Sequence, residues 1–143
     1  MNIMVFEDNP IAASVIKYLS DHDYKVWHAR SLLDVAYFLE EDPGLEGFDK
    51  LMFDAQVPIE EFPFMGTKEK KYGEKYGFSG FEFVTENYEI LKSKNLAMIT
   101  AFKIQLYDII KEDSIDENIF NKLTIIDKSA DDFMRQLLDF LNS

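Results

Sequence analysis

Cysteine is absent from this chain of 143 residues, and histidine nearly so. Without cysteine there can be no disulfide bond, no zinc–thiolate site and no thiol nucleophile. His22 and His28 are too few for a histidine-rich metal site. The N-terminal residues MNIMVFEDNP lack the basic start and the apolar stretch of a signal peptide, and no apolar run approaches the roughly 18 residues that span a bilayer. We therefore expect a cytoplasmic protein that is not inserted in a membrane.

Positive charge is also scarce. The chain has 15 Lys and Arg residues against 27 Asp and Glu residues, a formal net charge of −12. Nucleic acids and anionic membranes attract clustered cations, so neither is an expected partner. Apolar residues make up 47% of the chain and include 13 phenylalanines. At roughly 100–200 residues per domain, this is ample material for the core of one domain that spans residues 1–143.

Five short apolar runs alternate with segments of helical periodicity. An uninterrupted run such as residues 3–6 is typical of a strand that is buried on both faces of a sheet. The predicted strands lie at 3–6, 25–29, 51–54, 96–100 and 123–127, and the predicted helices at 11–19, 32–39, 81–91, 106–110 and 133–141. The alternation predicts an α/β domain, a doubly wound parallel sheet of five strands with helices on both faces.

Local signals set the expected ends of several helices. Ser31 with Asp34, and Ser129 with Asp132, form S-x-x-D capping boxes that predict helix starts. The periodic apolar residues of 81–91 predict a helix, which Asn95 can close.

One irregular segment, at about 59–79 between the third strand and the third helix, departs from the alternation. Loops in α/β units usually have about 2–6 residues, so this segment is predicted to be an insertion. Its glycines and proline favour an irregular loop, and its aromatic residues make it too apolar for a free linker. We expect it to fold onto its own domain, and a docking surface for a partner is the alternative.

Three acids, a hydroxyl and an amine lie where predicted strands end: Glu7, Asp8, Asp54, Thr100 and Lys128. The carboxyl ends of parallel strands meet at one edge of a sheet, where such folds place their chemistry. Two carboxylates about 4 Å apart repel by about 4 kcal/mol at an effective dielectric constant of 20. The cluster is tolerable if it is solvated, partly protonated, or binds a divalent cation. With oxygen ligands alone the cation would be Mg²⁺ or Mn²⁺.

A metal ion, an amine and a hydroxyl around one carboxylate suit the oxygens of a transferring phosphoryl group. Each residue taken alone also fits an ordinary structural role, such as a helix cap for Asp8 or a solvated surface lysine for Lys128. The joint arrangement is the stronger indication of function.

Five sequence segments, in order, resemble the receiver domain of two-component response regulators. They are VFEDNP, MFDAQVP, SGFEFV, MITAF and IIDKS. The resemblance covers almost the whole chain, with the segment 59–79 as the main interruption. It implies a flavodoxin-like sheet with strand order 2-1-3-4-5.

The resemblance also implies a metal site. Asp8 and Asp54 match the side-chain ligands of Mg²⁺, and Glu7 matches the acid that holds the site through water. Gln56 matches the position whose backbone carbonyl binds the metal. Mg²⁺, or Mn²⁺ in its place, is thus the expected cofactor.

The same resemblance implies a signalling role. Asp54 matches the phosphoacceptor, Lys128 the lysine that pairs with a phosphoryl oxygen, and Thr100 the hydroxyl that moves toward the phosphoryl group. The implied phosphate donor is a sensor histidine kinase or a histidine phosphotransfer protein, and an unknown downstream protein would respond. The only expected catalysis is self-phosphotransfer and autodephosphorylation, so the protein is not expected to be a turnover enzyme.

Two positions depart from the receiver pattern. Ile125 stands where an aromatic residue is usual, three residues before the lysine, and Ser129 stands where a cis proline usually follows the lysine. Rotation of the aromatic ring is part of the usual switch, so Ile125 puts the usual output route in doubt. Ser129 disfavours the cis bond, because a cis bond without proline costs roughly 2.5–4 kcal/mol. Because the chain stops at Ser143, soon after the fifth predicted helix, we expect a stand-alone receiver or a truncation of a longer regulator.

Three alternatives compete with this interpretation. In a flavodoxin-like redox protein, Glu7 and Asp8 would repel the phosphate of the cofactor. A haloacid-dehalogenase-type phosphatase needs a second aspartate where this chain has Gln56. A receiver-like binding module that is not phosphorylated remains open, and Ile125 and Ser129 favour it.

Overall fold

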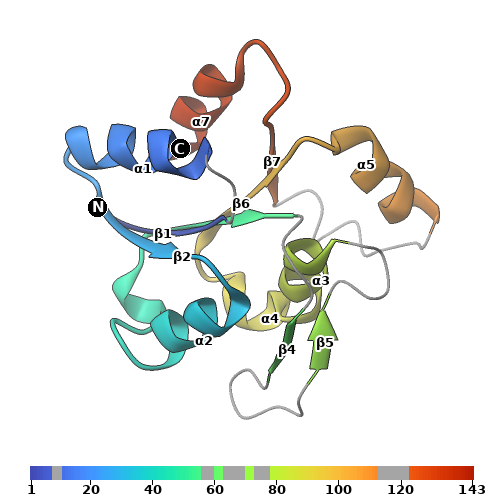
Figure 1. Cartoon of the computed structure of the whole chain (residues 1–143), viewed down its shortest axis with the longest axis horizontal. Coiled ribbons are helices and arrows are strands. Elements are labelled where there is room, and N and C mark those ends of the chain that lie inside the picture. The colour runs from blue at the N-terminus through green and yellow to red at the C-terminus, as the bar shows by residue number, and fades with distance from the viewer. Residues whose placement is uncertain (8–10, 56–59, 63–69, 73–77, 113–122) are drawn as a thin grey trace.

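The computed structural model describes residues 1–7, 11–55, 60–62, 70–72, 78–112 and 123–143 (Figure 1). Two of the predicted site residues, Asp8 and Gln56, lie outside these ranges.

Five parallel strands form the central sheet, as predicted. They are β1 (Asn2–Phe6), β2 (Lys25–Ala29), β3 (Lys50–Asp54), β6 (Asn95–Thr100) and β7 (Thr124–Asp127). Their order is β2-β1-β3-β6-β7, which confirms the predicted order 2-1-3-4-5. The apolar runs of β1 and β3 are buried on both faces, since helices cover both sides of the sheet.

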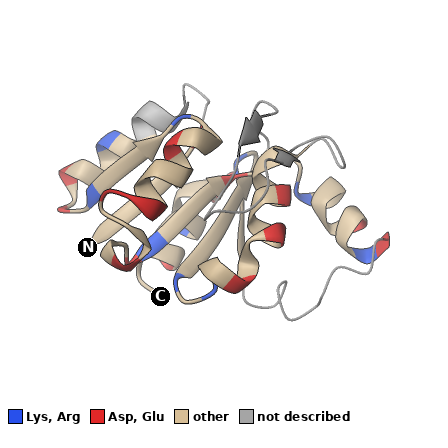
Figure 2. Ribbon diagram, turned by 90° about the horizontal axis from the view of Figure 1, so that it is seen from below, with Lys and Arg blue, Asp and Glu red and all other residues tan. Residues whose placement is uncertain are grey.

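Six helices and a short 3-10 helix accompany the sheet in the described residues. They are α1 (Ile11–Asp21), α2 (Leu32–Glu40), η1 (Leu45–Gly47), α3 (Ser79–Glu86), α4 (Tyr88–Leu91), α5 (Lys103–Glu112) and α7 (Phe133–Leu141). None of these is long and apolar enough to cross a bilayer. Figure 2 shows the strands largely free of charge, with most of the acidic and basic residues on the helices and loops.

Two hydrophobic clusters lie on opposite faces of the sheet. On one face, Val15 and Leu19 of α1 and Leu137 of α7 pack against Ile3 and Val5 of β1. On the other face, helices α2 to α5 pack against the alternate residues of the strands.

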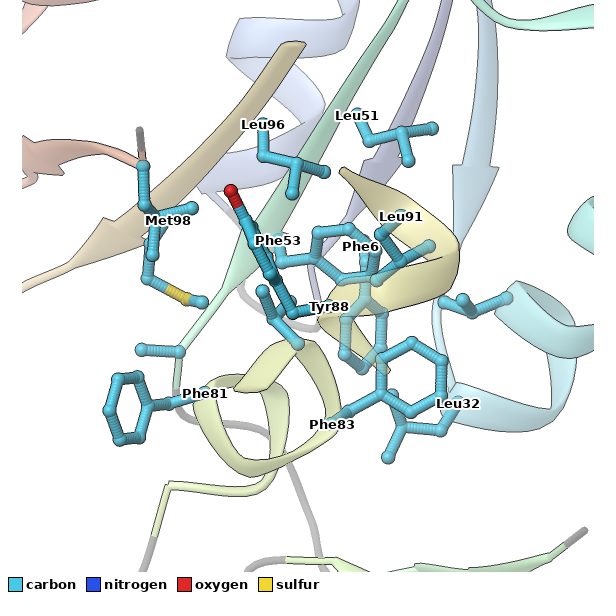
Figure 3. Packing of buried hydrophobic residues seen from close by; sticks show 14 of the residues in the cluster. Phe6, Leu32, Leu51, Phe53, Phe81, Phe83, Tyr88, Leu91, Leu96 and Met98 are labelled. Atoms are coloured by element: carbon cyan, nitrogen blue, oxygen red, sulfur yellow. The ribbon is translucent and has the colours of Figure 1, made fainter. Parts of the chain in front are cut away.

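Figure 3 shows part of the second cluster. The rings of Phe6 and Phe53 meet edge-on with centroids 6.1 Å apart, and Phe83 of α3 lies 5.8 Å from Phe53. Because side chains alternate along a strand, each apolar run supplies both cores at once.

The helix predicted over 81–91 is present, but the structure divides it into two helices. The α3 helix ends at Glu86 and α4 begins at Tyr88. Between them Asn87 leaves the helical conformation, with φ −108° and ψ 18°. Its side-chain amide donates to the Phe83 carbonyl oxygen at 2.9 Å, a local bond that competes with the helical pattern.

One of the two capping boxes is confirmed. The Asp34 amide donates to Ser31 Oγ at 3.1 Å, and the Arg30 amide donates to Asp34 Oδ2 at 3.0 Å. At the second position the prediction is wrong, because α7 begins only at Phe133. Ser129 instead donates through its amide and its hydroxyl to Asp127 Oδ1, at 2.9 and 2.7 Å.

The sequence predicts an irregular loop over 59–79, but part of this segment forms two short strands. Strands β4 (Glu60–Phe62) and β5 (Lys70–Tyr72) pair antiparallel in a small separate sheet. The first lies beside α2 and the second beside α3 (Figure 1). Each of these strands has two charged residues followed by one aromatic residue, so no alternation of polar and apolar residues marks it as a strand in the sequence. That this segment is an insertion stays a prediction.

Candidate functional site

The predicted site residues come from neighbouring strand ends. Glu7 directly follows β1, Asp54 ends β3, Thr100 ends β6 and Lys128 directly follows β7. The pairing of β1 with β3, β3 with β6, and β6 with β7 brings these ends to one edge of the sheet.

The ammonium group of Lys128 bridges two carboxylates. Its Nζ donates to Glu7 Oε1 at 2.5 Å and to Asp54 Oδ2 at 2.6 Å. Glu7 is 1% exposed and Asp54 is 5% exposed. Lys128 is aligned by its own backbone amide, which donates to the carbonyl oxygen of Thr100 at 2.8 Å. An acid, a second acid and an amine that are far apart in the chain therefore form one buried ionic cluster.

Thr100 lies at the same edge in a different arrangement. Its side chain is buried, and its hydroxyl oxygen accepts a hydrogen bond from the Phe102 amide at 2.8 Å. In this state the hydroxyl thus holds the loop that leads into α5. Asp8 and Gln56 lie outside the described residues, so their predicted roles stay predictions.

Burial and pairing shift the ionisation of this cluster. Burial raises the pKa of Glu7, and the charge of Asp54 raises it further, whereas the bond from Lys128 lowers it only in part. Burial by itself would lower the pKa of Lys128, but the hydrogen bonds to Asp54 and Glu7 outweigh it and raise that pKa. The amine therefore stays protonated and neutralises one of the two carboxylates it bridges.

The raised pKa of Glu7 predicts a pH-dependent stability. A carboxyl group that binds its proton more tightly in the folded chain stabilises the fold at pH values below its unfolded pKa of 4.5. This stabilisation is lost as the pH rises through the folded pKa. Glu7→Gln imitates the protonated acid and cannot ionise. In metal-free buffer, the melting temperature of the variant relative to wild type should therefore increase as the pH rises from about 4 through the folded pKa of Glu7. A difference that stays constant with pH would contradict the assignment.

The carboxylate oxygens at this edge of the sheet suit a hard cation, but the described residues do not form a complete metal site. Within the described part of the chain, no three acids or histidines are grouped as metal ligands. Glu7 and Asp54 supply carboxylate oxygens, which suit Mg²⁺. Asp8 and the Gln56 carbonyl would have to complete the set.

The start of α3 presses against the strand end that carries Asp54. The amides of Gly80 and Phe81 donate to the Ala55 carbonyl oxygen at 3.0 and 3.2 Å. A Cβ atom at Gly80 would lie 1.8 Å from the Asp54 carbonyl oxygen, so only glycine fits there. This positioning role was not predicted, although a Ser-Gly pair that opens a helix is a usable signal.

His28 is a second neighbour of the site that sequence reasoning missed. Its Nε2 lies 2.9 Å from the Glu7 carbonyl oxygen. The parallel pairing of β2 with β1 puts it there, and a lone histidine in a strand carries no signal of that contact.

The two departures from the receiver pattern are visible in the structure. Ile125 is half-buried and packs against the second hydrophobic cluster. The peptide bond from Lys128 to Ser129 is trans, and the cis bond in the described residues is Asp42–Pro43.

Comparisons with solved structures identify the fold. No protein-family model and no curated protein sequence matches the chain. It is similar to a CheY-like response regulator receiver domain protein from Methanospirillum hungatei JF-1, with 17% identity and a TM-score of 0.63, over 99% of this chain and 90% of that one.

Two further solved structures are similar to this chain over nearly its whole length. The signal receiver domain of an HD domain-containing protein from Pseudomonas fluorescens Pf-5 has 16% identity and a TM-score of 0.60, over 99% of this chain and 90% of that one. The chemotaxis protein CheY4 of Vibrio cholerae has 16% identity and a TM-score of 0.61, over 99% and 95%. The chain therefore has the fold of response regulator receiver domains, which confirms the resemblance seen in its motifs. At these identities the likeness shows the fold alone.

Proposed function

We propose that this chain is a response regulator whose Asp54 accepts a phosphoryl group from a phosphohistidine of a sensor kinase or a phosphotransfer protein. The observation that carries the proposal is the contact of Lys128 Nζ with Asp54 Oδ2 at 2.6 Å, at the carboxyl edge of a receiver-type sheet. An amine held against a buried carboxylate is the charge arrangement that phosphoryl transfer needs.

Transfer requires one bond to form and one to break. A carboxylate oxygen of Asp54 attacks phosphorus and forms an acyl phosphate, while the bond from phosphorus to the histidine nitrogen of the partner breaks. Lys128, already at hydrogen-bond distance, pairs with the phosphoryl oxygens. The burial of Glu7 and Asp54 limits the access of competing water.

Mg²⁺ belongs to the same proposal. Asp54, Asp8 and the Gln56 carbonyl would hold it, with Glu7 acting through water. When bound, it supplies neutralising charge to the phosphoryl oxygens. In the absence of metal, Lys128 bridges the two described acids and offsets the charge of one of them.

Phosphorylation would then act as a switch. Thr100 moves its hydroxyl toward the phosphoryl group, and the loop it now holds rearranges. A downstream protein reads the change, and the reaction ends in autodephosphorylation rather than turnover of a free substrate. A cytoplasmic location suits a kinase partner of this kind.

The test is mass spectrometry after incubation with acetyl phosphate and Mg²⁺. Wild type should gain one phosphate, and Asp54→Asn should gain none. Asp49→Asn is the matched control, because Asp49 is an exposed acid next to the opposite end of β3, and it should be phosphorylated like wild type. An adduct that persists in Asp54→Asn would move the phosphoacceptor elsewhere.

The second candidate is a receiver-like binding module that is never phosphorylated. The observation in its favour is Ile125, a half-buried aliphatic residue that packs against the core where an aromatic one is usual for the switch. Absence of any adduct in wild type would favour this function.

Metal dependence gives a separate prediction for Asp54→Asn. With one acid removed, Lys128 still pairs with Glu7 and the repulsion between the carboxylates disappears, so the metal-free melting temperature should rise. Mg²⁺ at roughly ten times its Kd should stabilise wild type by about 1.4 kcal/mol, and the variant far less. Melting curves with and without Mg²⁺ test both statements. A wild type that gains nothing from millimolar Mg²⁺ would overturn the metal assignment.

A further inference from the structure

The Thr100 hydroxyl and the start of α5 are joined by one hydrogen bond. The Phe102 amide donates to Thr100 Oγ1 at 2.8 Å. The Phe102 carbonyl in turn accepts from the Leu106 amide at 3.0 Å, in the first turn of α5. The position of the hydroxyl therefore constrains the backbone of Phe102, and with it the direction of its ring.

The ring of Phe102 reaches a second element of the site. It lies 6.1 Å from the ring of Phe78, tilted by 55°. Phe78 is buried and immediately precedes α3, and its carbonyl accepts from the Glu82 amide at 2.9 Å. Two residues further on, Gly80 donates to Ala55, the neighbour of Asp54. The ring pair thus connects the loop after β6 with the start of α3, and both ends are bonded to strand ends of the site.

Phe102 is unusual for a packing residue because 39% of its surface is exposed. Thr100, by contrast, is buried and closely held. A half-exposed ring fixed by a neighbouring hydroxyl can leave its partner without opening the core, which a fully buried ring cannot do.

We propose that Phe78 and Phe102 are positioning residues that hold the Thr100 hydroxyl in its unphosphorylated place and separate when it moves. The inference rests on the proposed function and concerns its regulation. When Thr100 turns its hydroxyl to a phosphoryl group on Asp54, the Phe102 amide loses its acceptor. The Phe102 ring then withdraws from Phe78 and uncovers the start of α3.

This relay does not need an aromatic residue on β7, where the chain has Ile125. It carries the change from β6 across to α3 through residues of the loop itself. The aromatic contact is worth about twofold to tenfold in the equilibrium between the two states.

The first experiment requires no phosphorylation. Thr100→Val keeps the shape of the side chain and removes the hydroxyl, whereas Thr100→Ser keeps the hydroxyl. Nuclear magnetic resonance of each variant would measure hydrogen exchange of the Phe102 amide and contacts between the rings of Phe78 and Phe102. Thr100→Val should exchange about fivefold faster or more and lose the ring contacts, and Thr100→Ser should resemble wild type. Ring contacts that persist in Thr100→Val would overturn the relay.

The second experiment uses beryllofluoride, a phosphoryl mimic, with Mg²⁺ on the wild-type protein. Its binding should speed exchange of the Phe102 amide and remove the ring contacts, as Thr100→Val does. Beryllofluoride that binds while the rings stay together would overturn the relay and leave the phosphoacceptor function intact. Failure of beryllofluoride to bind, together with no phosphate adduct, would overturn the proposed function and the relay with it.

A variant that leaves Thr100 untouched provides a check if Thr100→Val folds poorly. Phe78→Leu weakens the ring pair and should tighten beryllofluoride binding by about twofold to tenfold, because the unphosphorylated state loses the contact. Phe38→Leu, a half-buried ring on α2, is the control and should bind like wild type. Equal affinity for Phe78→Leu and wild type would contradict the positioning role.

Discussion

Lys128→Met is expected to destabilise the metal-free protein by about 3–5 kcal/mol, the range found when one partner of a buried ion pair is removed. The ammonium group is shared between Glu7 and Asp54, and both carboxylates are buried. Methionine fills a similar volume but removes the ammonium group that bridges the two buried carboxylates. Urea denaturation in the presence of a chelator measures the loss. The variant should also form no stable phosphate adduct, since the phosphoryl oxygens lose their amine.

The matched control is Lys92→Met. Lys92 pairs with Glu89 at 2.5 Å, a distance like that in the site, but the two side chains are 51% and 82% exposed. Exposed pairs contribute about 0–1 kcal/mol, so this variant should stay close to wild type. Mg²⁺ should also stabilise Lys128→Met more than it stabilises wild type, because the metal replaces the missing charge. A loss below about 1 kcal/mol for Lys128→Met would show that the bridge does not persist in solution.

The sheet could be predicted from sequence because its signal is local. Residues 3–6 of β1 and 51–53 of β3 are uninterrupted apolar runs, as expected for strands of a parallel sheet that is covered on both faces. The strand order was not contained in these runs. It came from the resemblance to receiver domains, and the observed pairing of β1 with both β2 and β3 confirms it.

The errors fall where several local patterns compete. The apolar residues on both sides of Asn87 keep helical spacing, yet the helix is divided at Asn87, whose side-chain amide donates to the Phe83 carbonyl oxygen. Ser129 has the spacing of a helix N-cap, yet its hydroxyl donates a hydrogen bond to Asp127, two residues earlier. Short polar side chains have several backbone and side-chain partners within reach, and tertiary packing decides among them.

For the site, the sequence predicted which residues lie together, and the structure tests this only for the described ones. Residues at strand ends were expected to meet, and Glu7, Asp54 and Lys128 do meet. Their repulsion was expected to require solvent, protons or a cation. In the structure, the ammonium group of Lys128 supplies the positive charge between the two carboxylates. This contact depends on the side-chain conformation of Lys128, which sequence spacing does not specify.

Gly80→Ala is expected to be the second most damaging change, because the added methyl group cannot be accommodated by a side-chain movement. Its Cβ would lie 1.8 Å from the carbonyl oxygen of Asp54 and 3.3 Å from that of Ala55, and both atoms belong to the backbone of the sheet edge. The start of α3 must move away, which breaks the amide bonds of Gly80 and Phe81 to Ala55. Overpacking of this kind usually costs about 1–3 kcal/mol, and the backbone clash places this variant at or above about 3 kcal/mol.

Thr85→Ala on the same helix separates this clash from a general effect on α3. Thr85 is half-buried and donates only a local bond to the Glu82 carbonyl at 3.1 Å, so the control should change the unfolding free energy by about 0.5 kcal/mol or less. Because the displaced helix start adjoins Asp54, Gly80→Ala should also slow labelling by acetyl phosphate, and Thr85→Ala should not. A Gly80→Ala protein with wild-type stability and labelling would mean that α3 does not sit against Asp54 as described.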